Sequence, residues 1–219
     1  MSSMETTLEV RWFIPGTLPK SVQKWFRLKC LGDLLEEEPE TREDLYTCQT
    51  PEEIAYFKAI AQNINNDAAI NLKLREGKLE LKLRQNVLKN QRFGNFQDAT
   101  VWQGNIEQWC KFSEQELTKI GLSISNLITK NNWISVYKKR EQKLEQGVKS
   151  ELTQLRISSN YWWSVAFEMS IDTNEYLHYD CFQSVFKTVI NCSCKTYDEP
   201  QLLTKNSYGY SRWLLNLSK

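Results

Sequence analysis

Charged and apolar residues alternate strictly in the stretch "NLKLREGKLELKLRQ", residues 71–85. Five leucines take one set of alternate positions, and mostly lysine, arginine and glutamate take the other. Successive side chains of a β-strand point to opposite faces, so the pattern predicts two strands with one leucine face and one charged face. Gly77 can supply the positive φ that a tight turn needs. An amphipathic β-hairpin is therefore predicted.

Further segments share this alternation or are rich in β-branched and aromatic residues, which is typical of strands. They are "TTLEVRWFI" (6–14), "VWQGNIEQWCKFS" (101–113), "NWISVYKKR" (132–140), "ELTQLRIS" (151–158) and "YWWSVAFEMS" (161–170). Several carry charges on alternate positions, as the hairpin does. The acidic stretch 32–44 is instead predicted to be a solvated loop.

Apolar residues at helical spacing predict the other elements. Val22 and Phe26 recur at a spacing of four, and capping signals precede amphipathic stretches at 52–64 and 117–128. Asp180 is a candidate cap of another helix, and "SYGYSRWLLNL" is amphipathic near the end of the sequence. Strands separated mainly by turns, with a few helices among them, favour an antiparallel α+β architecture. Seven or so strands can close into a barrel.

Composition narrows the class of protein. The 219 residues are 41% hydrophobic, so the chain can bury a substantial core, and no shift in composition marks a boundary. Residues 1–219 are therefore predicted to form one domain. The 28 basic and 27 acidic residues give a net charge of +1, which provides no bulk attraction to nucleic acid or to a membrane. Neither is expected as a partner, and any charged function must be local.

Other chemistry has little support in the sequence. The start "MSSMETTLEV" shows no targeting signal and no segment is apolar enough to cross a membrane, so a cytoplasmic location is expected. Six cysteines without such a signal are expected to be free thiols. The pair Cys192 and Cys194 has no histidine nearby to suggest a metal site. The single histidine, His178, has no marked nucleophile beside it, and no glycine-rich phosphate loop is present.

The orientation of the charged faces decides the function. Charges that face solvent and leucines that face inward would suit a lipocalin-like carrier of an apolar ligand. The helices predicted at 52–64 and 117–128, however, need an apolar sheet face to pack on, and the leucine face is available. We therefore expect the leucines to point out beneath helices and the charges to point into the barrel.

Charges inside a barrel must be hydrated, paired with one another, or matched by a ligand, because unpaired buried charge is very costly. Clustered cations with a few carboxylates suit a phosphorylated anion held with a divalent metal. The candidate phosphate-binding residues are Arg11, Lys73, Arg75, Lys82, Arg84, Lys138, Arg140 and Arg156. The candidate metal ligands are Glu9, Glu80 and Glu168.

These motifs resemble the CYTH superfamily of triphosphate tunnel proteins. "LEVRWF" is similar to its Glu-x-Glu-x-Lys first strand, and "LKLREGKLELKLR" is similar to its paired basic strands. With "GNIEQWCKFS", "WISVYKKR", "ELTQLRI", "WWSVAFE" and a terminal "SY...WL", the order resembles a group of uncharacterised bacterial CYTH-like proteins. The resemblance spans about residues 7–217. It implies an antiparallel barrel of about eight strands around a charged, hydrated tunnel, with Mg²⁺ or Mn²⁺ as cofactor.

The sequence lacks some of the acidic residues that the family's motifs contain. Glu9 and Arg11 match the second glutamate and the lysine of the first-strand motif, but Thr7 stands at the first glutamate. In the last strand Glu168 is one acid where a pair is common, and Ala166 takes the alternate position. The cations that correspond to phosphate-gripping residues are retained: Lys73, Arg75, Lys82 and Arg84. The resemblance thus favours anion binding over hydrolysis, because each lost carboxylate weakens metal capture.

Three functions lead from the sequence, with the lipocalin-like carrier kept as a further alternative and a cyclase supported only by the family resemblance. The first is binding of a small phosphorylated anion, such as a triphosphate, a nucleotide or polyphosphate. The second is a metal-dependent triphosphatase. The third is a non-catalytic interaction module whose inner charges pair among themselves and which binds a protein partner.

Overall fold

The computed structural model describes residues 5–47, 69–93, 102–112, 114–119, 133–171, 180–184, 186, 188 and 202–217. The strands are β1 (Glu5–Pro15), β2 (Asp33–Leu34), β3 (Glu40–Thr47), β4 (Ile70–Arg75), β5 (Lys78–Phe93), β6 (Trp102–Phe112), β7 (Trp133–Glu145), β8 (Val148–Ile157) and β9 (Asn160–Ile171). The helices are α1 (Lys20–Leu28), α3 (Glu114–Lys119), η1 (Thr204–Asn206) and α6 (Tyr210–Leu217). Residues 180–184, 186 and 188 are also helical.

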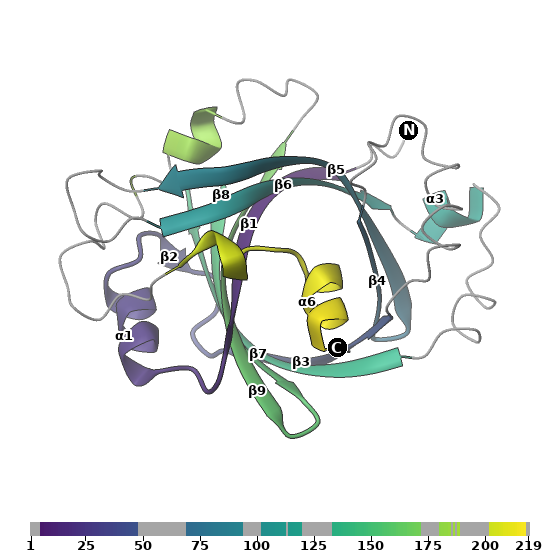
Figure 1. The fold of residues 1–219 in the computed structure, drawn as a ribbon, viewed down its shortest axis with the longest axis horizontal. Coiled ribbons are helices and arrows are strands. Elements are labelled where there is room, and N and C mark those ends of the chain that lie inside the picture. Colours follow the sequence, from purple (N-terminus) through teal and green to yellow (C-terminus); the bar gives the residue numbers. More distant parts are fainter. Residues whose placement is uncertain are drawn as a thin grey trace.

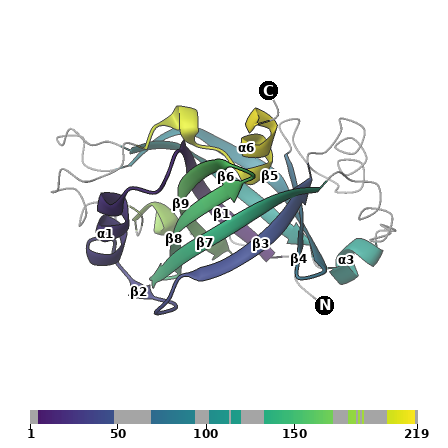
Figure 2. The same cartoon turned by 90° about the horizontal axis from the view of Figure 1, so that it is seen from below.

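Eight of these strands form a closed antiparallel barrel. Their order is β7-β3-β4-β5-β6-β1-β9-β8, and pairing of β8 with β7 closes the ring. The short β2 pairs with β7 as a ninth strand. Figure 1 looks along the barrel, and Figure 2 shows it from the side. The predicted α+β barrel with helices outside is confirmed.

The leucine face of the hairpin formed by β4 and the first half of β5 points out of the barrel. The buried side chains of Ile70, Leu72, Leu79, Leu81 and Leu83 pack with Leu117 of α3. Their alternate partners, which include Lys73 and Lys82, line a hollow inside the barrel. The structure therefore confirms the predicted orientation of the charged face.

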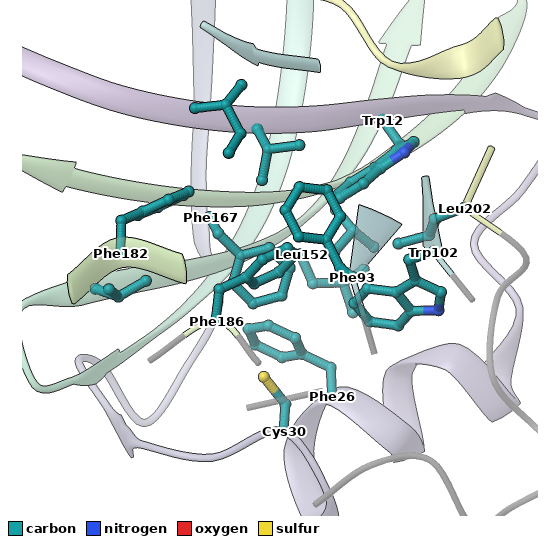
Figure 3. Close-up of a cluster of buried hydrophobic side chains, with 14 of the residues drawn as sticks. Trp12, Phe26, Cys30, Phe93, Trp102, Leu152, Phe167, Phe182, Phe186 and Leu202 are labelled. Carbon is teal, nitrogen blue, oxygen red and sulfur yellow. The ribbon is translucent and has the colours of Figure 1, made fainter. Parts of the chain in front are cut away.

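A larger apolar core lies outside the barrel, against the outer face of β1 and its neighbours. Trp12 of β1, Phe26 of α1, and Phe167 of β9 belong to it, with Phe182 and Phe186 of the 180–188 helical segment (Figure 3). The indole Nε1 of Trp12 donates a hydrogen bond to the carbonyl oxygen of Gln103 at 2.8 Å. Because helices cover its outer face, strand β1 is buried on both faces.

Helix α6 lies in one mouth of the barrel, where Figure 1 shows it in yellow within the ring of strands. Trp213 stacks on Phe13 of β1, with centroids 4.7 Å apart, and Tyr210 stacks on Tyr46 of β3 at 5.1 Å. Phe13, Tyr46, Tyr210, Trp213 and Leu214 belong to one apolar cluster. Aromatic packing therefore closes this mouth, which the sequence did not suggest.

Some predicted elements are not confirmed by the described residues. The prediction of a solvated loop at 32–44 is wrong in its second half, because β3 begins at Glu40 and Asp44 is fully buried. The helix predicted at 52–64 and residues 120–128 of the one predicted at 117–128 lie outside the described residues. None of the helices in the described part of the chain combines the length and apolar character that a membrane crossing requires.

Candidate functional site in the barrel hollow

The barrel encloses a hollow of about 260 Å³ whose wall is rich in charge. Nine basic side chains line it: Arg11, Arg42, Lys73, Arg75, Lys82, Lys111, Lys138, Arg140 and Lys149. Five carboxylates join them: Glu5, Glu9, Glu80, Glu151 and Glu168. The described lining thus carries four more basic than acidic groups, and Asp44 and Glu40, which pair with lining cations from outside the lining, reduce this surplus to two.

Strand alternation places these side chains. Glu9 and Arg11 are two residues apart on β1, as are Glu80 and Lys82 on β5, so each pair shares the inner face. Antiparallel register then sets Glu9 opposite Glu168 of β9. The charged residues converge because the strands curve into a ring.

The hollow gathers most of the predicted site residues but not all of them. Its lining includes Arg11, Lys73, Arg75, Lys82, Lys138, Arg140, Glu9, Glu80 and Glu168. Arg84 lines a different hollow, on the other side of α6. Arg156 lies on the outer surface, with its guanidinium 5.1 Å from the ring centroid of Tyr137. The placement of Arg156 in the tunnel was wrong, since it sits five residues after the inward Glu151 and an odd separation reverses the face.

Ion pairs link inward side chains of β1, β8 and β7. The Arg11 guanidinium contacts Glu9 at 2.6 Å and Glu151 at 2.6 Å, and Glu151 also contacts Arg140 at 3.2 Å. Although burial opposes it, the cations Arg11 and Arg140 hold the pKa of Glu151 well below its ordinary value. This cluster therefore stays ionised at neutral pH.

A second cluster surrounds the buried carboxylate of Asp44. Lys138 lies 2.9 Å from it and Arg75 3.0 Å, and Arg75 also reaches Glu80 at 3.5 Å. The Lys138 ammonium donates to the Tyr46 hydroxyl at 2.5 Å and lies 4.0 Å from the ring centroid of Tyr210. Complete burial lowers the pKa of Lys138 well below its ordinary value. Lys138 is thus held by Asp44 and by aromatic faces at the closed end.

Two lysines differ from this pattern. Lys73 contacts Glu80 at 3.0 Å, but burial, with nearby Arg75, lowers the pKa of Lys73 to about 8. Lys149 has no carboxylate within ion-pair distance among the described residues. The hollow therefore contains positive charge that its own carboxylates compensate incompletely.

The acids near Lys82 have partial features of a metal site. The Lys82 ammonium lies 3.4 Å from Glu168 and 3.9 Å from Glu9. Two oxygens in the same hollow, Thr7 Oγ1 and Asn71 Oδ1, are buried and find no hydrogen-bond partner in the described structure. Across the described ranges, no three histidine, cysteine, aspartate or glutamate side chains group to hold a metal. Glu9 and Glu168 still fit Mg²⁺ that shares its coordination with phosphate, since such ions need only one or two carboxylates.

The closed end of the hollow depends on close packing against Gly209. A Cβ added there would lie 2.8 Å from the Trp109 indole and 2.9 Å from Glu107 Oε2. Trp109 Nε1 donates to that same carboxylate at 3.1 Å. Only a residue without a side chain therefore lets α6 start beside this wall.

Replacing Gly209 with alanine is expected to displace α6 and to destabilise the fold by about 1–3 kcal/mol, the usual cost of overpacking. Urea unfolding followed by tryptophan fluorescence measures this loss. Ser211→Ala, in the same helix, is the control and should change stability little. Equal free energies of unfolding for the two variants would show that Trp109 and Glu107 can move to accommodate a Cβ at position 209 without loss of stability.

Several residues of the site were not among the candidates. Arg42, Asp44 and Tyr46 come from the stretch "ETREDLYT", which continues the polar, acidic run before it. Tyr210 and Gly209 come from the end of the described chain, far from the charged strands in sequence. The stretch of β3 is polar at both sets of alternate positions up to Asp44, so it gave no clear signal, and nothing local reveals that α6 enters the barrel.

Comparisons with known proteins give limited information. No protein-family model matches the chain, and no curated protein matches it. Among solved structures, a conserved hypothetical protein of Pyrococcus furiosus is 13% identical with a TM-score of 0.44, covering 93% of this chain and 98% of its own. The S. pombe Pct1 RNA triphosphatase, solved with the Spt5 CTD, is 11% identical with a TM-score of 0.44, covering 89% and 87%. A candidate adenylate cyclase of Bacillus halodurans is 14% identical with a TM-score of 0.37, covering 84% and 91%. At TM-scores below 0.5, these matches transfer no residue role to this chain.

Proposed function

We propose that the barrel hollow binds a compact anion with several negative charges, such as the phosphate groups of a triphosphate, a nucleotide or polyphosphate. The observation that carries this proposal is the concentration of nine basic side chains around a hollow of about 260 Å³, where the lining carboxylates together with Asp44 and Glu40 leave a surplus of two positive groups. Burying such a surplus without compensation costs free energy, and a phosphorylated anion supplies the missing negative charge. Lysine and arginine form charge-assisted hydrogen bonds with phosphate oxygens.

The depth of the cations suits a ligand with charge along its length. Arg11 and Lys138 lie deepest, with side chains 6% and 3% exposed, whereas the Lys111 side chain is 38% exposed. Helix α6 closes the end where Lys138 meets Tyr210. An anion entering from the opposite mouth would meet positive charge at successive depths.

Mg²⁺ or Mn²⁺ would be held by Glu9 and Glu168 together with ligand oxygens, and would neutralise phosphate charge there. Lys82, which now lies between those two acids, would then have to release at least one of them. Glu80 contacts Lys73 and Arg75 and belongs to a separate cluster. Metal and Lys82 would thus compete for the same carboxylates.

Two other candidates have specific support. A metal-dependent triphosphatase is supported by Glu9 and Glu168 standing opposite each other, since a metal there could orient water toward a bound phosphate. A structural module without ligand is supported by the extent of ion pairing around Arg11 and Asp44. The surplus positive charge favours ligand binding over the second of these.

Thermal unfolding tests the proposal, with inorganic triphosphate, ATP and citrate added separately, each with and without Mg²⁺ or Mn²⁺. A ligand at 100 times its dissociation constant stabilises the fold by about 2.7 kcal/mol. Triphosphate or ATP is expected to raise the melting temperature, and phosphate release in the same samples identifies hydrolysis. No shift with any anion would overturn the proposal and favour the structural module.

Removing the Lys73 charge provides the residue-level prediction. Lys73→Met is expected to weaken triphosphate binding about 10- to 100-fold, the worth of one charge-assisted hydrogen bond. The Lys73 pKa of about 8 means that its ammonium is present below pH 8 and lost above it. Wild-type affinity should therefore fall from pH 7 to pH 9, and the variant should show less of this fall.

Isothermal titration at pH 7, 8 and 9 measures both effects. Lys139→Met is the matched control, because Lys139 is an exposed lysine on the outer face of β7. If the control loses as much affinity as Lys73→Met, general electrostatic attraction explains the binding and the hollow does not.

A further inference from the structure

A second hollow, here called the far hollow, lies on the opposite side of α6 from the first. Its volume is about 370 Å³, and its wall comes from β5, β6, η1, α6 and the turn between the last two. Four basic side chains line it, Arg84, Lys89, Lys205 and Arg212, against one carboxylate, Glu107. The far hollow is thus also positive, and it is built from other residues.

Irregularities in β5 shape this hollow. The pairing of β5 with β6 shifts register between Arg84 and Asn86 and again between Leu88 and Gln91. Asn90 lies within the second shift and has a positive φ of 56°. Bulges of this kind bend a strand and redirect its side chains. They direct Val87, Lys89 and Asn90 toward the segment before α6.

Asn105 of β6 fixes the opposing wall. Its side-chain oxygen accepts a hydrogen bond from the Asn90 backbone N–H at 3.0 Å, and its side-chain nitrogen donates to the Ser207 carbonyl oxygen at 3.0 Å. The Asn105 backbone N–H donates to Ser207 Oγ at 2.8 Å. Three separate segments are therefore held together around the cavity before any ligand binds.

The charges of the far hollow select an anion. Its one carboxylate, Glu107, is 5% exposed and already accepts a hydrogen bond from Arg84 at 2.6 Å. Glu107 therefore compensates the charge of Arg84, and the described lining of the far hollow holds no further carboxylate for the other basic side chains. Lys205 and Arg212 are exposed at the rim. A single buried acid engaged by arginine is a poor metal site, and polar walls are a poor site for an apolar ligand. Lysine, arginine and asparagine donors together suit phosphate oxygens.

The two hollows are separate sites. Among the described residues, they share no lining side chain. The wall between them is the contact of Gly209 with Trp109 and Glu107, which leaves no room for a Cβ. A ligand in one hollow therefore does not extend into the other while α6 stays in place.

We propose that the far hollow is a second anion site, which takes a small molecule bearing a phosphate or diphosphate group independently of the barrel hollow. Asparagine side-chain amides report on the two sites separately. Asn105 and Asn216 line the far hollow, and Asn71 lines the first. Nuclear magnetic resonance of ¹⁵N-labelled protein, titrated with inorganic pyrophosphate, follows all three.

The signals of Asn105 and Asn216 are expected to shift saturably in the wild type. The double variant K205E/R212E should weaken that response at least tenfold and leave the melting temperature near that of the wild type. The control K24E/K139E makes the same charge change at exposed lysines outside both hollows and should leave the response unchanged. Absent or unsaturable shifts at Asn105 and Asn216, or equal weakening in the control, would overturn the proposal.

The response of Asn71 is read in the same titration, so failure of the far hollow is distinguishable from failure of the barrel hollow. Vesicles with and without phosphatidic acid then separate two sources of phosphate. Cosedimentation that K205E/R212E abolishes identifies a lipid headgroup, and no cosedimentation identifies a soluble molecule.

Discussion

Replacing Leu81 with aspartate is expected to unfold the barrel. Leu81 is 1% exposed and packs with Leu72, Leu79 and Leu117 between the sheet and α3. A carboxylate there would be buried without a partner, at a cost above about 4 kcal/mol, when an entire domain is stable by only about 5–15 kcal/mol. Circular dichroism and thermal melting measure the loss.

The control for this change is Lys78→Asp. Lys78 starts the same strand but is exposed, so the same new side chain remains in water and should leave the melt nearly unchanged. Similar melting of the two variants would contradict the outward, covered position of the leucine face.

Replacing Arg11 with methionine is expected to destabilise the protein by about 3–5 kcal/mol. Methionine keeps much of the side-chain volume, but it leaves Glu9 and Glu151 buried without their shared guanidinium. The double variant Arg11→Met/Glu151→Gln removes one of these two charges and should recover part of the loss. Urea unfolding at pH 7 measures each free energy of unfolding.

The pH dependence separates lost charge from lost packing. In the wild type Arg11, against the effect of burial, holds the pKa of both Glu9 and Glu151 below the ordinary value near 4.5. Their stabilising contribution is therefore present above pH 4.5 and is lost as the pH falls through the lowered values. Without Arg11 that contribution shrinks, so the gap between variant and wild type should narrow on acidification. A constant gap would mean that the loss comes from packing.

The sequence was sufficient for the barrel because one rule, alternation, is local. The hairpin at 71–85 showed both faces directly, and the amphipathic helices indicated which face they would cover. The same rule, applied strictly, separates Glu151 from Arg156. It does not identify β3, because polar residues fill both sets of alternate positions from Glu40 to Asp44.

The rest of the site depends on contacts that are distant in sequence. Asp44 gathers Lys138 and Arg75 from two other strands, and only the register of the closed ring brings them together. Whether an inner cation is paired or available cannot be inferred from one strand. The far hollow likewise arises from bulges in β5 meeting the segment before α6, and neither has a distinctive motif.

The closure of the ring has a consequence for how quickly the chain reaches this state. β3 pairs with β7, where the hydrogen-bonded Glu40 and Arg140 are 100 residues apart, and Ser170 of β9 bonds Glu5 of β1 across 165 residues. Such distant partners must meet before their pairing can compensate the entropy of closing the intervening chain. Neighbours such as β7, β8 and β9 pair through short turns instead. Refolding should therefore be slow, about milliseconds to seconds or longer, as is usual where non-local strand pairing dominates.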